Sequence, residues 1–250
     1  ILATELTAHA APDGYTVLAC TSNHAGYPHM YKKLPFDIGK DFEYVTQATI
    51  SPLVLVVHPT VPAKTMQDFI VYARNNPGKM NYGSSGPGGP PHIAGEMLKS
   101  MAKINLTHIV YKGVAPALTA ALSNEVQMTF TNLFSGQPHV KGGRLRVLAV
   151  TSARRLQAAP EWPTIAESGV PGYEASIWYG FLLPAKTPKP IIDTLHREIT
   201  AVLKLPDVSQ TFVTQGGEVI ASTPAEFQKA FLDDVERLGR VIRDAGIKGE

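Results

Sequence analysis

The stretch MNYGSSGPGGPPHIAGEML, residues 80–98, joins a short apolar segment to an amphipathic helix through a turn rich in glycine, serine and proline. In its second half, Ile93, Met97 and Leu98 recur at the spacing of one helix face. The stretch therefore predicts a strand, a tight turn and a helix over 91–103, in that order along the chain.

Strands and helices alternate on both sides of this stretch, which predicts an α/β fold with mostly parallel sheets. Thr65 and Thr223 precede two of the expected helices as N-caps, with Asp68 and Glu226 three residues further on. Further helices are expected at 1–11, 114–123, 135–142, 188–204 and 206–214. Strands are expected at 15–21, 42–50, 53–58, 107–110, 126–131, 145–151, 176–184 and 217–220.

Composition narrows the class of protein. A chain of 250 residues with 44% hydrophobic and 18% charged residues is globular, and it is long enough for one large domain or two lobes. The net charge of +2 gives no reason to expect a nucleic-acid partner. Cys20 is the single cysteine, which excludes an internal disulfide. No apolar run is long enough to span a membrane, and no signal peptide is present in the chain as given.

Three familiar glycine-rich turns do not fit residues 83–89. A mononucleotide loop needs lysine where Gly89 stands. The dinucleotide fingerprint needs glycine where Pro91 stands, and the hydrolase elbow needs glycine where Pro87 stands. The turn therefore matches neither the two nucleotide-binding motifs nor the hydrolase motif.

An anion-binding turn fits the composition better, because backbone N–H groups and hydroxyls would lie beside the positive end of helix 91–103. A carboxylate suits such a turn, since it requires donors and no metal. The candidate donors are Ser84, Ser85, Gly86, Gly88, Gly89 and His92. The alternative, that the glycines only allow the chain to turn tightly, stays open.

Two other polar segments follow expected strands, at the carboxyl ends where open α/β sheets bind ligands. Thr21, Ser22 and Asn23 follow strand 15–21, and an ordinary turn is the alternative there. Thr131 and Asn132 end strand 126–131, and Asn132 could donate to a ligand oxygen. His24 and His29 lie near the first segment without an accompanying cluster of Asp, Glu or Cys, so no metal site is expected.

The order of several motifs resembles the Bug-type extracytoplasmic solute receptors, the substrate-binding proteins of tripartite tricarboxylate transporters. The resemblance covers essentially the whole chain. It rests on AAPDGYTVL (10–18), MYKKLPFDIGKDF (30–42), YGSSGPGG (82–89) with His92, YKGVAPAL (111–118), GRLRVLAVTSARR (143–155), PTIAESGVPGYE (163–174) and PAKTPKPIIDTL (184–195).

The resemblance implies the two-lobed periplasmic binding protein fold of type II, with the ligand cleft between the lobes. Lobe one would comprise 1–53 and 177–250, and lobe two 54–176. The implied function is capture of a small organic carboxylate and its delivery to membrane permease subunits or to a sensor. The resemblance implies no cofactor and no catalysis, and a monomeric protein located in the periplasm or elsewhere outside the cytoplasm.

This chain departs from the family's usual pattern in the 83–89 turn and after strand 126–131. The family commonly has asparagine at Pro87, and small polar residues at Gly89, Pro90 and Pro91. Proline lacks the N–H donor, so carboxylate binding would rest on Ser84, Ser85, Gly86 and Gly88. The family often has an acid at Thr131, which argues against an amino-acid ligand here.

In the family, a strand, a helix and a second strand precede the segment that resembles residues 1–14. The resemblance therefore predicts that strand 15–21 lies at a sheet edge in this chain. An alternative function from a different class is a serine hydrolase that uses Ser84 or Ser85 with His92.

Overall fold

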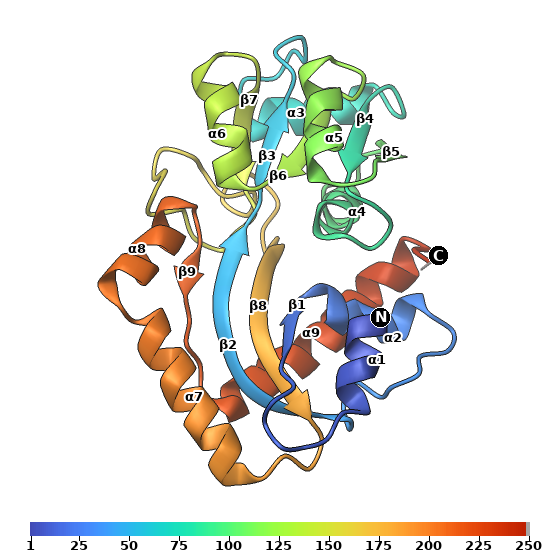
Figure 1. The fold of residues 1–250 in the computed structure, drawn as a ribbon. Coiled ribbons are helices and arrows are strands. Elements are labelled where there is room, and N and C mark those ends of the chain that lie inside the picture. Colours follow the sequence, from blue (N-terminus) through green and yellow to red (C-terminus); the bar gives the residue numbers. More distant parts are fainter. Residues whose placement is uncertain (249–250) are drawn as a thin grey trace. The chain divides into compact units, whose positions relative to one another are not determined.

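The computed structural model describes residues 1–248, and its chain forms two compact units (Figure 1). The first unit combines Ile1–Ile50 with the segment that begins at Ile177, and the second unit is Ser51–Ser176. The first unit is thus built from two stretches of sequence, and the second from one. Among the residues that are described, we find no helix long and apolar enough to cross a membrane.

The sheet of the first unit has the strand order β1-β8-β2-β9. Its strands are β1 (Leu18–Thr21), β8 (Ser176–Pro184), β2 (Phe42–Pro52) and β9 (Glu218–Val219). β1 pairs with β8 and lies at the edge of the sheet, which agrees with the expectation for strand 15–21.

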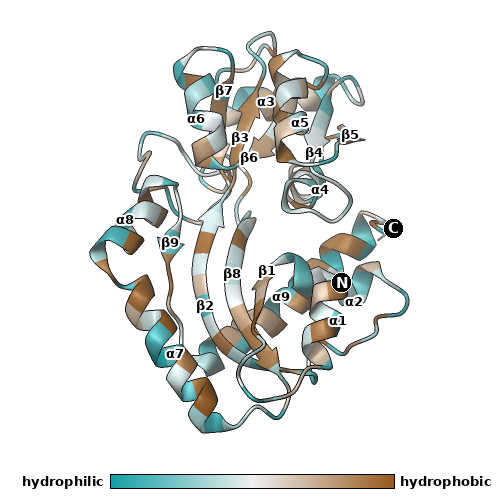
Figure 2. Cartoon of the chain, in the orientation of Figure 1, coloured by the Kyte–Doolittle hydropathy of each residue, from teal (hydrophilic) through white to brown (hydrophobic). Residues whose placement is uncertain are grey.

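Helix α9 provides much of the first unit's core. Its N-terminus has the predicted capping box, in which Thr223 and Glu226 bond reciprocally. The apolar stripe of α9 is buried, and the rings of Phe227 and Phe231 contact Tyr44 of β2 and Trp178 of β8. Apolar and polar residues alternate along α9 and α7 (Figure 2). The helices of this unit are α1 (Leu2–Ala8), α2 (Asn23–Met30), α7 (Lys189–Leu203), α8 (Pro206–Thr214) and α9 (Pro224–Asp244).

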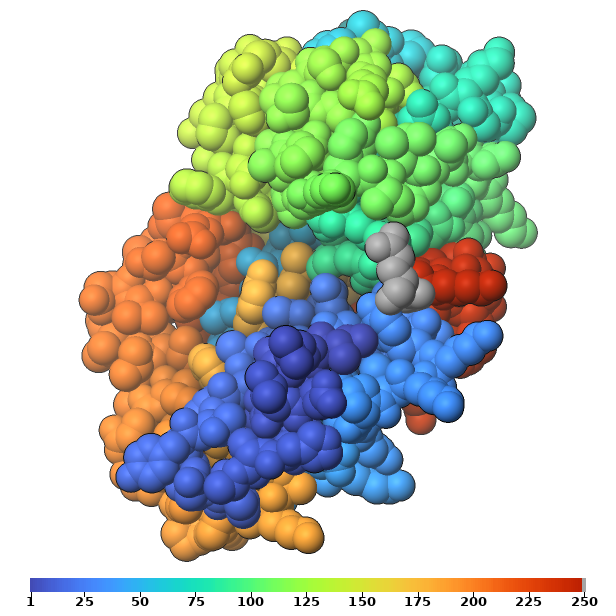
Figure 3. Space-filling model, turned by 45° about the vertical axis from the view of Figure 1, so that its right-hand side comes forward, coloured from blue at the N-terminus to red at the C-terminus, as the bar shows by residue number. Residues whose placement is uncertain are grey.

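The two stretches that form the first unit lie against each other. In Figure 3 the blue N-terminal segment packs beside the orange β8 and α7 segments. His29 of α2 approaches α9 so closely that a Cβ at Gly239 would lie 2.4 Å from its Nε2 atom. The same Nε2 atom lies 2.9 Å from the carbonyl oxygen of Val235, so His29 links α2 to α9.

The sheet of the second unit has the order β5-β4-β6-β3-β7. Its strands are β3 (Val54–Val57), β4 (Asn81–Ser84), β5 (Thr107–Val110), β6 (Met128–Thr131) and β7 (Arg146–Val150). Its helices are α3 (Met66–Asn75), α4 (Pro90–Ala102), α5 (Val114–Leu122) and α6 (Leu133–Lys141). A core of residues that include Val54, Leu118 and Leu133 packs α5 and α6 onto the sheet.

The α/β class is confirmed, but the expectation of mostly parallel sheets is wrong. β4 pairs in parallel with β5 and β6, whereas β3 is antiparallel to β6 and β7. In the first unit, β8 is antiparallel to β1 and runs opposite to β2 (Figure 1), and β2 is antiparallel to β9. The reason is that one strand in each sheet runs against both of its neighbours. This strand is β8, between β1 and β2, in the first unit, and β3, between β6 and β7, in the second.

Candidate functional site

Three strands of the second unit end at the same edge of its sheet, and a helix follows each. β4, β5 and β6 share one direction, and they lead into α4, α5 and α6. None of these three helices has an acidic residue in its first turn. The edge therefore gathers three positive helix ends whose charge no carboxylate of that first turn offsets.

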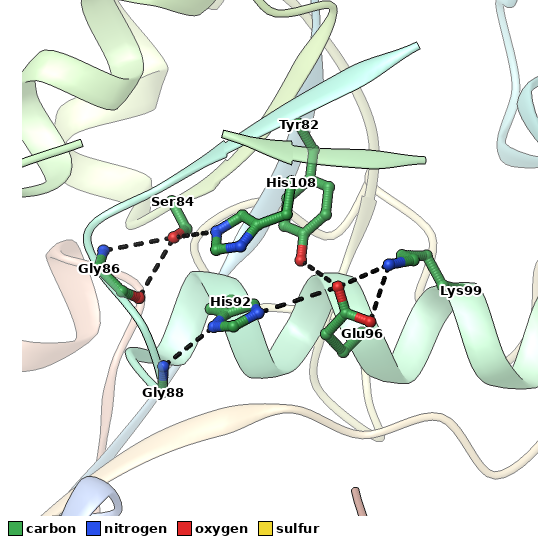
Figure 4. A network of polar contacts seen from close by, with 8 residues as sticks. All are labelled: Tyr82, Ser84, Gly86, Gly88, His92, Glu96, Lys99 and His108. Atoms are coloured by element: carbon green, nitrogen blue, oxygen red, sulfur yellow. Dashed lines mark hydrogen bonds and ion pairs between the residues drawn. The ribbon is translucent and has the colours of Figure 1, made fainter. Parts of the chain in front are cut away.

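The turn between β4 and α4 is held by hydrogen bonds within the chain (Figure 4). Ser84 is fully buried, and its Oγ accepts from the N–H of Gly86 at 3.3 Å. The N–H of Gly88 donates to Nδ1 of His92 at 2.9 Å. Gly86 and Gly88 have φ angles of 135° and 67°, which side chains with a Cβ rarely adopt. These two glycines are therefore required for the shape of the turn.

The N–H groups of the glycines, which were expected to bind a ligand, are instead bonded within the turn. The N–H groups of Gly86 and Gly88 have partners in the turn, and that of Gly89 donates to the carbonyl of Gly86. Within residues 1–248, the N–H groups of Ser85 and His92 donate to no other atom of the chain. Ser85 and His92, rather than the glycines, therefore carry the donors of this turn that are open to a ligand.

His92 and His108 stack face to face beside the turn. Their ring centroids are 3.8 Å apart with an interplanar angle of 18°. His108, which comes from β5, lies with Nε2 only 2.6 Å from Oγ of Ser84. Tyr82 of β4 stacks on the other face of His108 at 4.8 Å. The stack thus links β4, β5 and α4 directly beneath the turn.

A buried carboxylate completes this network. Oε1 of Glu96 accepts from the hydroxyl of Tyr82 at 2.6 Å and from Nζ of Lys99 at 2.7 Å. Nε2 of His92 lies 3.9 Å from the same carboxylate. Because Tyr82 and Lys99 already bond to it, the charge of Glu96 is balanced inside the network.

Burial keeps both imidazoles of the stack neutral. It lowers the pKa of His92 from 6.5 to about 4, and the neighbouring His108 acts in the same direction. Burial also lowers the pKa of His108. For Tyr82, burial and the hydrogen bond to Glu96 raise the pKa. A neutral His92 agrees with its geometry, since Nδ1 must lack a proton to accept from Gly88.

Thr131 and Asn132 lie at the end of β6, the strand next to β4. The register pairs Gly83 with Thr129, so the turn after β4 and the end of β6 follow paired strands. Oγ1 of Thr131 is buried, and it is the one such side-chain atom of the described chain that lacks a hydrogen-bond partner. Oδ1 of Asn132 accepts from the N–H of Ser135 and caps α6. The hydroxyl of Thr131 is therefore buried and without a partner among the described residues, and such a group calls for a partner from outside the chain.

The candidates of the first unit lie at the junction of β1 and α2. Thr21 ends the strand, and its N–H donates to Nδ1 of His24 at 3.1 Å. Ser22 is buried and precedes the helix, and Asn23 is half-buried in its first turn. Burial lowers the pKa of His24 from 6.5 to about 4. Helix α2 was not predicted from the sequence, because it contains Pro28 and its apolar residues follow no helical period.

The geometry required by the hydrolase alternative differs from the one observed. Ser84 contacts His108 and not His92, and Nδ1 of His92 is occupied by the N–H of Gly88. Ser84 is also fully buried, so its hydroxyl is closed to a substrate. The pairing of Ser84 with His92 that this alternative requires is not observed, and Ser84 pairs with His108 instead. In the part of the chain that is described, no group of three or more His, Cys, Asp or Glu side chains could hold a metal ion.

Sequence reasoning did not identify Tyr82, Glu96, Lys99 or His108 as parts of this site. A signal existed in α4, where His92, Glu96 and Lys99 follow one another at spacings of four and three, which is one helix face. His108 had no such signal, because only the pairing of β4 with β5 brings it to Ser84.

Known proteins resemble this chain over nearly its whole length. The sequence profile of the family described as "Tripartite tricarboxylate transporter family receptor" matches residues 1–247. A UPF0065 protein of Bordetella pertussis is 32% identical over 251 residues, which cover 99% of this chain and 77% of the relative. Protein BugT of the same organism is 31% identical over 252 residues and is covered to the same extents.

Solved structures give the same result. The R. palustris protein solved with adipate matches with a TM-score of 0.88 and 32% identity, over 99% of this chain and 83% of its own. The periplasmic binding protein BugD matches with a TM-score of 0.85 and 28% identity, over the same shares. MatC from Rhodopseudomonas palustris with bound malate matches with a TM-score of 0.83 and 25% identity, over 96% of this chain and 83% of its own.

Proposed function

The chain belongs to the family of tripartite tricarboxylate transporter receptors and is a solute-binding receptor for carboxylates, and we propose that its second unit binds one ligand carboxylate at the β4–α4 turn. The observation that carries this proposal is that hydrogen-bond donors without a partner lie at the strand ends where α4, α5 and α6 begin. None of these helices has an acidic residue in its first turn. These donors are the N–H groups of Ser85 and His92 and the hydroxyl of Thr131.

The physical argument for a carboxylate is its match to these groups. A carboxylate has two oxygens and about four acceptor positions, and it carries the negative charge that helix N-termini favour. Hydrogen bonds to a charged acceptor are worth about 1.5–3 kcal/mol each. Ser84, Gly86 and Gly88 contribute indirectly, because their internal hydrogen bonds fix the turn that presents Ser85 and His92.

A dicarboxylate or hydroxy acid without an amino group is the ligand class we propose. The R. palustris relatives were solved with adipate and malate, which are acids of this class. Thr131 offers a neutral hydroxyl where an ammonium group would need a carboxylate partner. Asn132 has an amide that is open to a ligand oxygen through its Nδ2 atom, since Oδ1 caps α6.

In the first unit, we propose Thr21, Ser22 and Asn23 as further ligand contacts. They follow a strand and precede α2, and the side chains of Thr21 and Asn23 are half-buried. Asn23→Ala tests this proposal separately from the second unit, because it removes one amide at the helix surface. An unchanged affinity in this variant would remove the β1–α2 junction from the site.

The receptor is proposed to be non-catalytic, monomeric and periplasmic, and to deliver its ligand to permease subunits or to a sensor. The family profile and the periplasmic proteins that it resembles support this role. The burial of Ser84 supports the absence of hydrolysis. A fluorophosphonate probe is therefore expected to leave all serines unlabelled, and labelling of Ser84 or Ser85 would favour the hydrolase.

The ligand itself is best found by releasing it. We expect mass spectrometry of small molecules from the denatured, purified chain to detect an organic acid. A thermal-shift screen should then show a rise in melting temperature with malate, succinate or adipate, because a ligand that binds only the native state stabilises it. The matched diamides, which keep the shape and lose the charge, should have no effect. A screen in which acids and diamides act alike would overturn the proposal.

A further inference from the structure

The geometry points to His92 and His108 as positioning residues: we infer that the two stacked neutral imidazoles hold the β4–α4 turn in its ligand-binding shape. This inference deepens the proposed function and rests on it for its consequence, although the positioning itself can be tested without any ligand. Neither imidazole needs to contact the ligand for this role.

His92 fixes the second half of the turn. The N–H of Gly88 donates to its Nδ1 at 2.9 Å, so Nδ1 has no proton and the neutral ring carries its proton on Nε2. Gly88 has a φ angle of 67°, and the hydrogen bond to His92 helps to hold the turn in this conformation. An imidazolium would have protons on both nitrogens and could not accept from Gly88. Protonation of His92 therefore removes this hydrogen bond.

His108 fixes the first half. Its Nε2 atom lies 2.6 Å from Oγ of Ser84, and that same oxygen accepts from the N–H of Gly86 at 3.3 Å. The hydroxyl of Ser84 also lies 3.3 Å from the carbonyl of Gly86, to which it can donate. Ser85 lies between these anchors, and the direction of its open N–H depends on both of them.

The surroundings favour two neutral rings. His92 and His108 stack at 3.8 Å, a distance at which two imidazolium charges would repel strongly. Tyr82 covers the other face of His108, and its hydroxyl bonds to Glu96. Glu96 attracts a proton to His92, whereas Lys99 and His108 oppose it, and Lys99 bonds to both oxygens of Glu96. Burial is the largest cause, and it lowers the pKa of His92 to about 4.

The first test reads the imidazoles directly in the full chain without ligand. Long-range ¹H–¹⁵N spectra at pH 7 should show His92 as the tautomer with the proton on Nε2. As the pH is lowered, the amide proton resonance of Gly88 should shift together with the titration of His92. A His92 that carries its proton on Nδ1 at pH 7, or a Gly88 amide that ignores the titration, would overturn the inference.

Variants give the second test, with adipate and malate as calorimetric probes. His92→Leu removes the acceptor and should weaken binding by about tenfold or more. His92→Asn places an amide oxygen near the position of Nδ1, so it should restore most of the lost affinity and should abolish the acid-dependent shift of Gly88. His58→Asn is the matched control, since His58 follows β3 at the opposite edge of the same sheet.

The outcomes separate the two proposals. If neither acid binds the wild-type chain but His92 shows the predicted tautomer and Gly88 follows it, the carboxylate assignment fails and the positioning role stands. If folded His92→Leu binds as tightly as wild type, the positioning role fails. If His92→Leu does not fold, the comparison of His92→Asn with wild type across pH decides, and identical Gly88 shifts in both would overturn the inference.

Discussion

Two threonines of β6 show how the surroundings of a residue decide whether its hydroxyl contributes to stability. Thr129 and Thr131 are equally buried, with 1% of each exposed. Oγ1 of Thr129 donates to the carbonyl of Gly83 at 2.9 Å, whereas Oγ1 of Thr131 has no partner within residues 1–248. The first hydroxyl supports the pairing of β6 with β4, and the second makes no such contribution.

Valine at each position tests this difference. Thr129→Val leaves the Gly83 carbonyl without its donor and should lower the free energy of unfolding by about 1–3 kcal/mol. Thr131→Val removes an unpaired polar group and should leave the stability unchanged or slightly higher, because no partner is lost. Urea denaturation of both variants measures the two effects. Equal destabilisation by the two substitutions would contradict the assignment of an unpaired hydroxyl to Thr131.

Helix α4 depends on one glycine for its close approach to β4. A Cβ at Gly95 would lie 2.3 Å from the ring of Tyr82, the ring that bonds to Glu96 and stacks on His108. The absence of a side chain at Gly95 therefore lets α4 and the β4–α4 turn pack closely on the strands.

Gly95→Ala should destabilise the protein, although alanine favours a helix by about 1 kcal/mol over glycine. Overpacking of a core costs about 1–3 kcal/mol, and here it also displaces the Tyr82 hydroxyl from Glu96. Gly26→Ala in α2 is the control, since its Cβ would meet only the ends of two flexible side chains, Ile242 at 3.2 Å and Met30 at 3.6 Å. Thermal unfolding should separate the two variants, and a Gly95→Ala protein as stable as wild type would refute the packing argument.

Sequence reasoning worked best for elements with local signals. The helices that begin after Thr65 and Thr223 were located from these N-cap residues, and the structure has a capping box at each of them. Helix α2 has no such signal and was missed. Strand direction was wrong for β3 and β8 because their neighbours come from distant parts of the sequence, and local pattern carries no information about that pairing. The same limit hid His108 from the candidate site.

Across the whole molecule, each unit contains a neutral histidine: His24 of the first unit is half-buried and His92 of the second is buried. Burial lowers the pKa of His24 in the first unit and of His92 in the second unit, in each case from 6.5 to about 4. Between these two pH values the unfolded chain binds protons that the native chain excludes. Stability therefore falls as the pH decreases through this window, since the unfolded state binds more protons there.

The predicted result is a loss of stability from pH 6.5 toward pH 4 with a slope of up to about 1.4 kcal/mol per pH unit for each histidine. Urea denaturation at a series of pH values measures it. His92→Asn should remove its share of the slope and keep that of His24. A stability that is constant or rises on acidification over this range would contradict the burial of both neutral rings.

At this scale the order of motifs was more informative than any single one. The motif around Gly83–Gly89 fits several chemistries by itself, and the position of YKGVAPAL and PTIAESGVPGYE after it identified the family. The motifs could not reveal the hydrogen bonds within the turn. These bonds use the N–H groups of the glycines and leave those of Ser85 and His92 without a partner.

The most direct test of carboxylate recognition is a calorimetric titration of the purified wild-type chain with malate, succinate and adipate, each beside its diamide. We predict that at least one of the acids binds saturably at a single site and that its diamide, which cannot offer a charged acceptor to Ser85 and His92, does not. Binding of a diamide with the affinity of its acid, or a complete absence of binding by all three acids to ligand-free protein, would contradict the account.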